Sequence, residues 1–229
     1  MPYRKGRQLR ILSALLIGPG GLVPTAAAQT AAPAPQMQHR HADAQSYIAS
    51  LEDPARDAYQ KPDEVLAALA LRPGQVIADI GAGSGYFTLR FARAVGETGR
   101  VYAVDVSPDM IRHLNRRIRD SRLRNVVSVL SDPDDPLLAD ASVDRFVIVD
   151  TWHHVEDQAK YLSLMKRMLK PGGQVVQIDF QKRPLPLGPP EAMKIAREDL
   201  LRQMEAAGFR LAAEHTFLPY QYFLAFVPR

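Results

Sequence analysis

Asp79-Ile80-Gly81-Ala82-Gly83-Ser84-Gly85-Tyr86 is a glycine-rich stretch between an expected strand, residues 76–80, and an expected helix, residues 86–95. Glycine accepts positive φ angles and has no Cβ, so alternating glycines allow a sharp turn and the close approach of a ligand. A purely structural turn would not need three alternating glycines. The strand–loop–helix context predicts a binding loop for a nucleotide-like cofactor.

The chain on both sides of this loop alternates between strands and helices. Apolar runs predict strands at 76–80, 101–106, 125–130, 145–150 and 174–180, and capped or amphipathic segments predict helices at 62–71, 86–95, 108–120, 156–170 and 197–207. Nearly continuous apolar strands between helices predict a parallel sheet covered on both faces. Two last strands, expected at 215–218 and 222–227, are too close in sequence for a crossover and must form an antiparallel hairpin at the sheet edge.

Asp105 ends the second expected strand, at the same edge of the sheet as the glycine loop. A carboxylate there can accept hydrogen bonds from both ribose hydroxyls of an adenosine cofactor. Nicotinamide dinucleotides use the same layout, but their fingerprint has a third glycine where this chain has Tyr86. S-adenosylmethionine has no phosphate, and its sulfonium and ammonium groups favour nearby acids such as Asp79. The residues therefore favour S-adenosylmethionine, with a nicotinamide oxidoreductase as a distant alternative.

The motifs at 79–86, Val104-Asp105 and Leu169-Lys170-Pro171-Gly172-Gly173, with the terminal hairpin, resemble those of class I S-adenosylmethionine-dependent methyltransferases. The resemblance spans residues 46–229. It implies an α/β, Rossmann-like fold with a seven-stranded, mostly parallel sheet, helices on both faces, and only the last inserted strand antiparallel. The expected cofactor-binding residues are Asp79, Gly81, Ala82, Gly83, Gly85, Tyr86, Asp105, Val106, Asp132 and Asp150.

Two of these acids carry specific expectations from the resemblance. Asp132 would face the adenine amino group, and Asp150 would end the fourth strand beside the methyl donor. Asp132 can also be a plain turn residue within Ser131-Asp132-Pro133-Asp134-Asp135, and this alternative stays open.

The candidate catalytic residues are His153, His154 and Asp150, which follow the fourth expected strand. An imidazole there can act as a general base for the acceptor, although one of two adjacent histidines is expected to pack inward as a structural residue. The segment lacks the Asn/Asp-Pro-Pro-Tyr/Phe motif with which some family members hold an amide or an adenine amino group. The chain has no cysteine, which excludes disulfides, thiolate metal sites and the nucleophile of cytosine C5 methylation.

Other polar and aromatic side chains have weaker signals. Asp179 ends the fifth strand and can orient a substrate, and Tyr220 can line a pocket at the hairpin turn. Four cations can hold an anionic acceptor or can be solvated surface charge: Lys182, Arg183, Lys194 and Arg197. Three residues precede the first expected helix, where a lid over the cofactor is possible: Arg56, Tyr59 and Gln60.

The N-terminal residues have the pattern of an export signal. A basic start with Arg4, Lys5, Arg7 and Arg10 is followed by the apolar run 11–17 and by Ala26-Ala27-Ala28, which predicts a signal peptide over 1–28 with cleavage at Ala28–Gln29. The apolar run is too short for a membrane span. Residues 29–45 are rich in Ala, Pro and Gln and indicate a flexible linker, in which His39 and His41 are expected to be solvated rather than metal ligands.

The charge of the 229-residue chain follows from this leader. The formal net charge is +4, but residues 1–28 hold four basic residues and no acid, so residues 29–229 are neutral. A nucleic-acid partner is therefore not expected. The sequence predicts an exported, periplasmic or secreted enzyme that methylates a small molecule. The alternative is an exported protein that binds S-adenosylmethionine or a nucleoside without catalysis, because the cofactor is made in the cytoplasm.

Overall fold

The computed structural model describes residues 44–229, so the predicted signal peptide, its cleavage position, His39 and His41 lie outside the described residues. The elements in chain order are α1 Ala44–Leu51, η1 Pro54–Arg56, α2 Asp57–Gln60, α3 Pro62–Leu69, β1 Val76–Ile80, α4 Thr88–Val95, β2 Arg100–Asp105, α5 Pro108–Asp120, β3 Val126–Leu130, β4 Val143–Val149, η2 Trp152–His154, α6 Gln158–Met168, β5 Leu169–Phe180, η3 Glu191–Met193, α7 Arg197–Ala206, β6 Phe209–His215 and β7 Gln221–Pro228.

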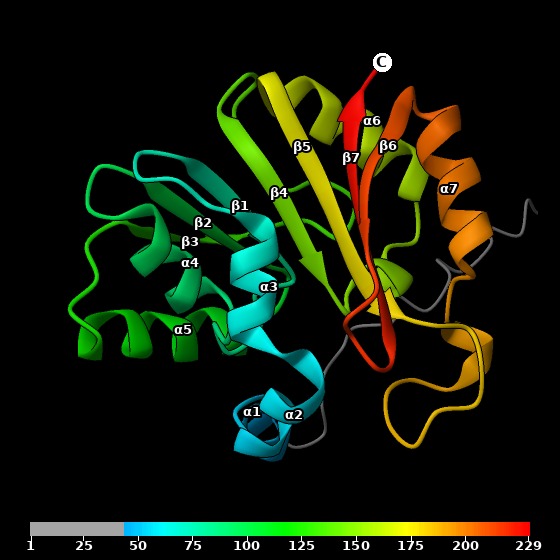
Figure 1. The fold of residues 1–229 in the computed structure, drawn as a ribbon. Helices are drawn as coiled ribbons and strands as arrows, with labels where there is room; N and C mark the ends of the chain where they lie inside the picture. Colours follow the sequence, from blue (N-terminus) through cyan, green and yellow to red (C-terminus); the bar gives the residue numbers. More distant parts are fainter. Residues whose placement is uncertain (1–43) are drawn as a thin grey trace, which may run out of the picture. The chain divides into compact units, whose positions relative to one another are not determined.

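The strands form one seven-stranded sheet in the order β3-β2-β1-β4-β5-β7-β6 (Figure 1). Strands β3, β2, β1, β4 and β5 pair in parallel, and β7 lies antiparallel to both β5 and β6. This confirms the predicted Rossmann-like α/β fold with its antiparallel hairpin at the edge. The parallel strands end at one edge, where their carboxyl termini bring loop residues together.

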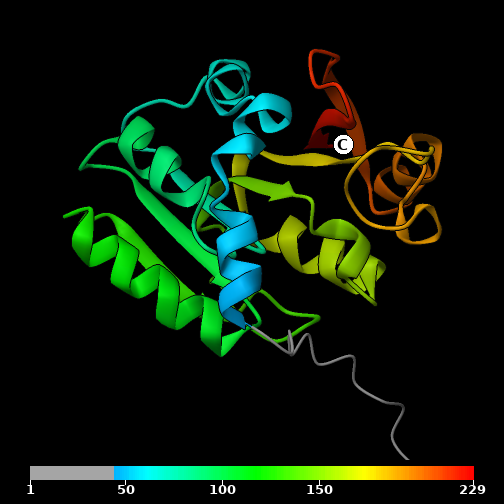
Figure 2. The same ribbon diagram turned by 90° about the horizontal axis from the view of Figure 1, so that it is seen from below.

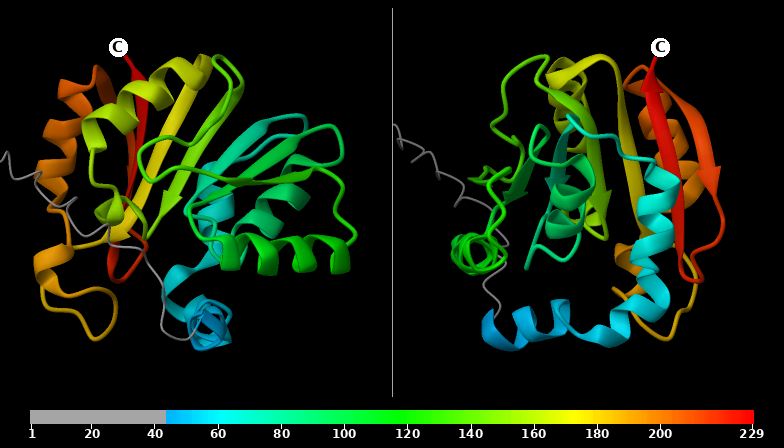
Figure 3. Two further views of the ribbon diagram at one scale, coloured as in Figure 1. Left: turned by 180° about the vertical axis from the view of Figure 1, so that it is seen from behind. Right: turned by 60° about the vertical axis from the view of Figure 1, so that its left-hand side comes forward.

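Helices cover both faces of the sheet, and each face has its own apolar core. On one face, α3 and α4 pack through Val65, Phe91 and Val95, and α5 packs beside them through Leu114. On the other face, α6 and α7 pack through Met165 and other apolar side chains (Figure 3, left). The buried strands are apolar on both sides because both sides meet helices.

The structure differs from the sequence prediction in two strands. The strand expected at 215–218 is wrong, because β6 runs over Phe209–His215. In this edge strand only Phe209 is buried and residues 210–214 are exposed, so apolar and charged side chains are mixed, whereas the apolar Leu218 is buried in the loop that follows. In addition, β5 begins at Leu169 rather than at 174, with a shift in register between its pairs Val143↔Leu169 and Arg145↔Gln174. The Pro-Gly-Gly segment is thus part of an irregular strand, a usual place for proline and glycine in a sheet.

Three short helices before α3 were not expected as helices. The elements α1, η1 and α2 lie at the edge to which the arrowheads of β4 and β5 point (Figures 1 and 2). None of the residues of α1 is fully buried, and its apolar face is the half-buried set Ala44, Tyr47, Ile48 and Leu51. This spacing is helical, but eight residues are too short a window for the period to stand out in the sequence. Within residues 44–229, no helix has the length and apolar composition needed to cross a membrane.

Candidate functional site

The glycine loop closes over the end of β2 through backbone hydrogen bonds. The amides of Gly81 and Ala82 donate to the carbonyl oxygen of Val104 at 2.9 and 3.0 Å. The next amide, that of Gly83, donates to Oδ2 of Asp105 at 2.8 Å. The loop and the acid after it in sequence are therefore one connected unit at the carboxyl edge.

All three alternating glycines have positive φ, with values of 71° at Gly81, 54° at Gly83 and 86° at Gly85. A Cβ at Gly81 would lie 2.3 Å from the side chain of Thr151, and a Cβ at Gly85 would lie 2.4 Å from Leu114 Cδ1. Contacts within the protein therefore require glycine at 81 and 85 even without a ligand. At Gly83 the nearest atom is Leu51 Cδ1 of α1, at 3.1 Å.

Asp105 is held from two sides. Its Oδ2 accepts the Gly83 amide and its Oδ1 accepts the Ser107 amide, both at 2.8 Å, and the residue is 8% exposed. A carboxylate can accept several hydrogen bonds on its two oxygens, which is the chemistry that a ribose diol requires. Val106, which comes next, is 42% exposed and offers an apolar contact for a planar base. This donor and acceptor set fits the adenosine half of the cofactor.

Asp132 also lies at the carboxyl edge, directly beyond β3. It is exposed and begins a tight turn that is closed by a bridge between Asp132 and Asp135. The turn geometry matches the plain alternative, and the adenine contact remains a prediction.

Asp79 is a buried acid beneath the loop. It is 3% exposed and accepts a hydrogen bond from Thr88 Oγ1 at 2.6 Å. Burial raises the pKa of the Asp79 carboxyl to about 7, and the negative charge of Asp105 adds to the shift, while Thr88 opposes it. A cationic ligand nearby would favour its ionised form.

Asp150 follows β4 in a left-handed conformation with φ 51°. The Gln221 side-chain amide donates to its Oδ1 at 2.8 Å and to its Oδ2 at 3.0 Å, and the Gln60 amide donates to Oδ2 as well. The pKa of Asp150 is raised to about 7, chiefly by burial and then by the neighbouring charge of Asp179, while the two amides oppose the rise. The sequence singled out Gln60 only as part of a lid, and it gave no signal for Gln221.

His153 and Asp179 form a nearly buried pair between η2 and the end of β5. His153 Nδ1 lies 2.9 Å from each carboxylate oxygen of Asp179, and the two side chains are 3% and 1% exposed. The Phe180 amide donates to Asp179 Oδ1 at 2.8 Å. An ionised carboxylate only accepts, so Nδ1 carries the proton and Nε2 is left as the acceptor nitrogen. Asp179, expected to orient a substrate, contacts the candidate base instead.

His154, the second candidate base, is exposed, and its ring centroid lies 4.2 Å from that of His153. Of the two histidines, His153 is the one that packs inward. Its contact with the Asp179 carboxylate gives His153 the arrangement of an oriented base.

The first helices bring further groups to this edge. Burial raises the pKa of the Tyr47 hydroxyl, and the charges of Asp105 and Asp150 raise it further, so Tyr47 of α1 stands within electrostatic reach of both acids. Glu52, just after α1, contacts His113 Nε2 at 2.6 Å and Arg117 Nη1 at 3.0 Å, which ties this segment to α5. The expected lid region thus lies next to the residues that are expected to bind the cofactor.

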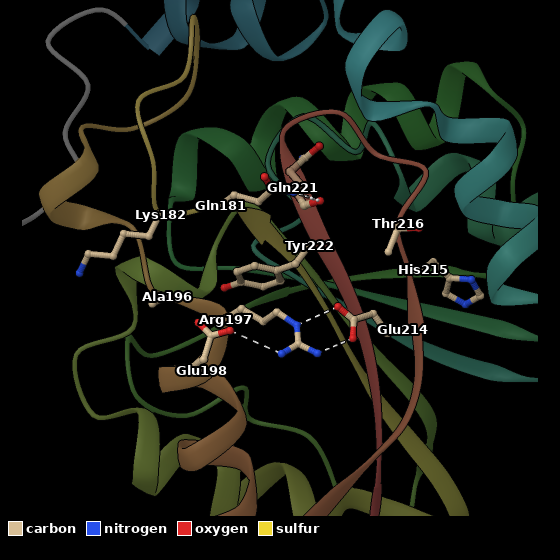
Figure 4. A pocket seen from close by; sticks show the side chains of 10 residues that line it. All are labelled: Gln181, Lys182, Ala196, Arg197, Glu198, Glu214, His215, Thr216, Gln221 and Tyr222. Atoms are coloured by element: carbon tan, nitrogen blue, oxygen red, sulfur yellow. Dashed lines mark hydrogen bonds and ion pairs between the residues drawn. The ribbon is translucent and has the colours of Figure 1, made fainter.

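The four cations proposed to hold an anionic acceptor are not gathered into one free site. Arg197 forms ion pairs with Glu198 and Glu214, as the dashed lines in Figure 4 show. Lys194 is buried and donates to the carbonyl oxygen of Arg183 at 3.0 Å. A cavity of about 260 Å³ has Lys182, Arg197 and Tyr222 in its lining, but not the acids Asp79, Asp105 or Asp150. No cluster of metal-ligating side chains occurs in the part of the chain that the structure describes.

Residues 77–173 match the family model described as a methyltransferase domain. Among curated proteins, the ubiquinone/menaquinone biosynthesis C-methyltransferase UbiE of Klebsiella pneumoniae is 34% identical over 113 residues, which are 49% of this chain and 45% of that protein. The protein of the same name from Vibrio cholerae is 37% identical over 112 residues, or 48% and 43% of the two chains. This chain therefore spans less than half the length of these relatives.

Solved structures extend the similarity beyond the matched domain. An S-adenosylmethionine-dependent methyltransferase from Aquifex aeolicus is 29% identical with a TM-score of 0.76, over 80% of this chain and 97% of that one. A TehB-like methyltransferase from Corynebacterium glutamicum, 16% identical with a TM-score of 0.64 over 82% and 99%, shows the shared fold alone. Residues 77–173 are thus a methyltransferase domain, and S-adenosylmethionine is its cofactor.

Proposed function

From this methyltransferase domain and its cofactor, we propose that the chain transfers a methyl group to a small molecule that must lose a proton to become the nucleophile. The observation that carries the proposal is the His153–Asp179 pair, one sheet strand away from Asp150 at the same carboxyl edge. S-adenosylmethionine, when bound, supplies an activated methyl group on its sulfonium. The protein then has to align the acceptor and remove its proton.

Each side chain has a distinct task in this proposal. Asp105 holds the ribose hydroxyls. Asp150, fixed by Gln60 and Gln221, places negative charge where the positive sulfonium end is expected. His153 accepts the acceptor's proton at Nε2, and Asp179 keeps Nδ1 protonated and stabilises the imidazolium that forms. The near-complete burial of the pair strengthens this stabilisation, because little water screens it.

Aromatic side chains beside Asp150 support a planar acceptor. The ring centroid of Tyr59 lies 6.4 Å from that of Phe180 and 6.2 Å from that of Tyr220. Phe180 pairs across the sheet with Gln221, which itself holds Asp150. Rings at these separations offer stacking and edge contacts to another ring. The acceptor class that combines a ring with a removable proton is a hydroxylated aromatic compound, such as a phenol or a quinol.

The relatives agree with this acceptor class. Their name places them at a methylation of carbon in ubiquinone and menaquinone biosynthesis, and the ring carbon beside a phenolate is such a nucleophile. This chain shares about half of its length with them, so the similarity supports the class of acceptor and leaves the individual compound open.

We also propose that the enzyme acts after export. The support is the order of basic, apolar and small residues over 1–28, which is the order of a secretory signal. The acceptor would then be a small molecule available outside the cytoplasm.

The test is a methyl-transfer assay with labelled S-adenosylmethionine on small phenols and chemically reduced naphthoquinones. We expect transfer by the wild type, and a fall of about 10²–10⁴-fold in kcat for His153→Ala with nearly unchanged affinity for S-adenosylhomocysteine. Asp179→Asn should also lower kcat, because an amide can accept from or donate to Nδ1 and no longer enforces one tautomer.

His154→Ala is the matched control, because it removes the neighbouring imidazole, which is exposed. It should change kcat little. If His153 and Asp179 are only structural, their variants lose melting temperature and cofactor affinity together while kcat of the folded fraction stays normal. That result would refute the base assignment. Binding of S-adenosylmethionine without transfer to any acceptor of this class would instead favour the non-catalytic alternative.

A further inference from the structure

Tyr86, the residue that replaces the third fingerprint glycine, contacts two arginines. The guanidinium carbon of Arg56 lies 4.4 Å from the centre of the Tyr86 ring, and that of Arg90 lies 4.2 Å from it. The hydroxyl of Tyr86 donates to Asp57, next to Arg56 in sequence. Guanidinium groups over a tyrosine ring are held by its negative face, so the ring fixes the position of both cations.

The two arginines differ in their charge partners. Arg90 is paired with Asp57 at 3.5 Å and donates to the Tyr86 carbonyl oxygen at 2.7 Å. Within residues 44–229, Arg56 donates to the carbonyl oxygen of Leu51 and to the Tyr59 hydroxyl, but is in no ion pair with a carboxylate. Arg117 also reaches the glycine loop, at the Ser84 carbonyl oxygen, but is paired with Glu52. Of these three arginines at the loop, Arg56 is therefore the one whose charge is not neutralised by an ion pair with a carboxylate.

Arg56 also lies at the carboxyl edge of the sheet, where the cofactor is expected. Leu51, whose carbonyl oxygen it binds, packs over Gly83 of the loop. The positive charge of Arg56 acts on the carboxyl of Asp150 and on the hydroxyl of Tyr47, which are both site residues. It is half-buried, so a partner would be bound with limited competition from water.

The charges of the cofactor give this cation a partner. The amino-acid half of S-adenosylmethionine has two positive groups and one carboxylate. The acids Asp79, Asp105 and Asp150 suit the positive groups and the ribose, and none of them suits a carboxylate. We propose that Arg56 binds the carboxylate of the cofactor, with Tyr86 as the platform that positions its guanidinium. The inference rests on S-adenosylmethionine being the cofactor, and it assigns a residue that makes the site select amino-acid-bearing adenosines.

The experiment compares two ligands that differ by the carboxylate alone: S-adenosylhomocysteine and its decarboxylated form, S-adenosyl-3-thiopropylamine. Calorimetry on the full chain should show wild-type preference for S-adenosylhomocysteine. Arg56→Met should weaken the binding of S-adenosylhomocysteine on the order of 10- to 100-fold, which is the range for the loss of hydrogen bonds to a charged group. The same variant should change the affinity for the decarboxylated ligand by no more than about twofold, since that ligand has no carboxylate for Arg56 to bind.

Arg90→Met is the matched control, because it removes the other guanidinium from the same ring while Asp57 already neutralises it. It should leave the ratio of the two affinities unchanged, with melting curves to confirm folding of each variant. Equal weakening of both ligands by Arg56→Met, or no weakening, would overturn the carboxylate assignment. A wild type that binds neither ligand would overturn it together with the proposed function, and that outcome is visible before any variant is made.

Discussion

At the residue scale, Asp105 holds the glycine loop and is the residue expected to bind the ribose of the cofactor. Its two oxygens accept the amides of Gly83 and Ser107, so the carboxylate is fixed before any ligand arrives. A fixed acceptor loses little entropy when a ribose binds, which favours affinity. The same contacts make the residue part of the structure of the loop.

We therefore expect Asp105→Ala to weaken binding of S-adenosylhomocysteine by about 1.5–3 kcal/mol, the value of lost hydrogen bonds to a charged group. Calorimetry measures the affinity, and a melting curve shows whether the loop amides left without an acceptor also lower stability. Asp109→Ala is the control, because Asp109 is an exposed acid paired with Arg112 on the nearby helix α5. Unchanged affinity in a folded Asp105→Ala protein would place the ribose elsewhere.

At the scale of single residues, Asp79 and Asp150 also predict how stability and cofactor binding depend on pH. Both have a pKa raised to about 7, chiefly by burial, so near and below that pH they hold protons that the unfolded chain has lost. A raised carboxyl pKa means that the stability of the ligand-free protein should fall as pH rises from about 4 to about 7. A bound cationic cofactor favours the ionised carboxylates, so the two acids prefer to be deprotonated when the cofactor is present.

Binding of S-adenosylmethionine should therefore release protons at pH 6–7 and tighten as pH rises through about 7. Calorimetry in two buffers of different ionisation enthalpy measures the proton release. Asp79→Asn removes one of the two titrating groups and should reduce it. Proton uptake, or an affinity that is flat across this range, would contradict the assignment of these acids to the positive end of the cofactor.

At the scale of elements, α1 has no fully buried residue, and Glu52 just beyond it joins His113 and Arg117 of α5. Leu51 and Tyr47 of α1 reach the glycine loop and the site acids. A helix without a fully buried residue opens at a lower free-energy cost than the core strands.

Glu52→Gln should release α1 from α5, with a loss of roughly 1 kcal/mol or less for a partly exposed ion pair. Hydrogen exchange should then become faster over residues 44–51 and stay unchanged in β1 and β4. Affinity for S-adenosylhomocysteine should fall with it if α1 covers the bound cofactor. Glu97→Gln, which alters an exposed acid in the loop after α4, is the control. Equal exchange in both variants would show that α1 is held by other contacts.

At the scale of the whole molecule, the described domain and the predicted leader over residues 1–28 carry separate hypotheses. The described residues carry the fold and the site, whereas the export hypothesis rests on residues 1–28 alone. Their removal would take away the excess positive charge and leave an electrically neutral chain. A neutral domain gives no reason to expect a polyanionic partner.

We expect the protein recovered from its native host to begin at Gln29, because small residues at 26–28 follow the apolar run. Mass spectrometry of the N-terminal peptide in periplasmic and cytoplasmic fractions measures this directly. A variant with Ala28→Pro should slow cleavage and serves as a comparison. An intact Met1 on soluble cytoplasmic protein would end the export hypothesis.

Local signals in the sequence were sufficient for the parallel strands of the sheet and for the place of the glycine loop and Asp105 at their carboxyl edge. The loop is continuous in sequence, and strands buried on both faces must be apolar, so each can be recognised within a short window. Edge strand β6 escaped recognition because most of its residues are exposed, and helix α1 because its half-buried face spans only eight residues.

The contacts between distant residues were decided only by the tertiary structure. The pairing of His153 with Asp179, the amides of Gln60 and Gln221 on Asp150, and the arginines over Tyr86 join residues from different strands and helices. A side chain's type shows what chemistry it can do, but its partner is set by sheet order and register, which no local pattern encodes. The chain's own sequence thus determined the fold and the cofactor class. The packing of β4, β5 and β7 decided that His153 contacts the Asp179 carboxylate.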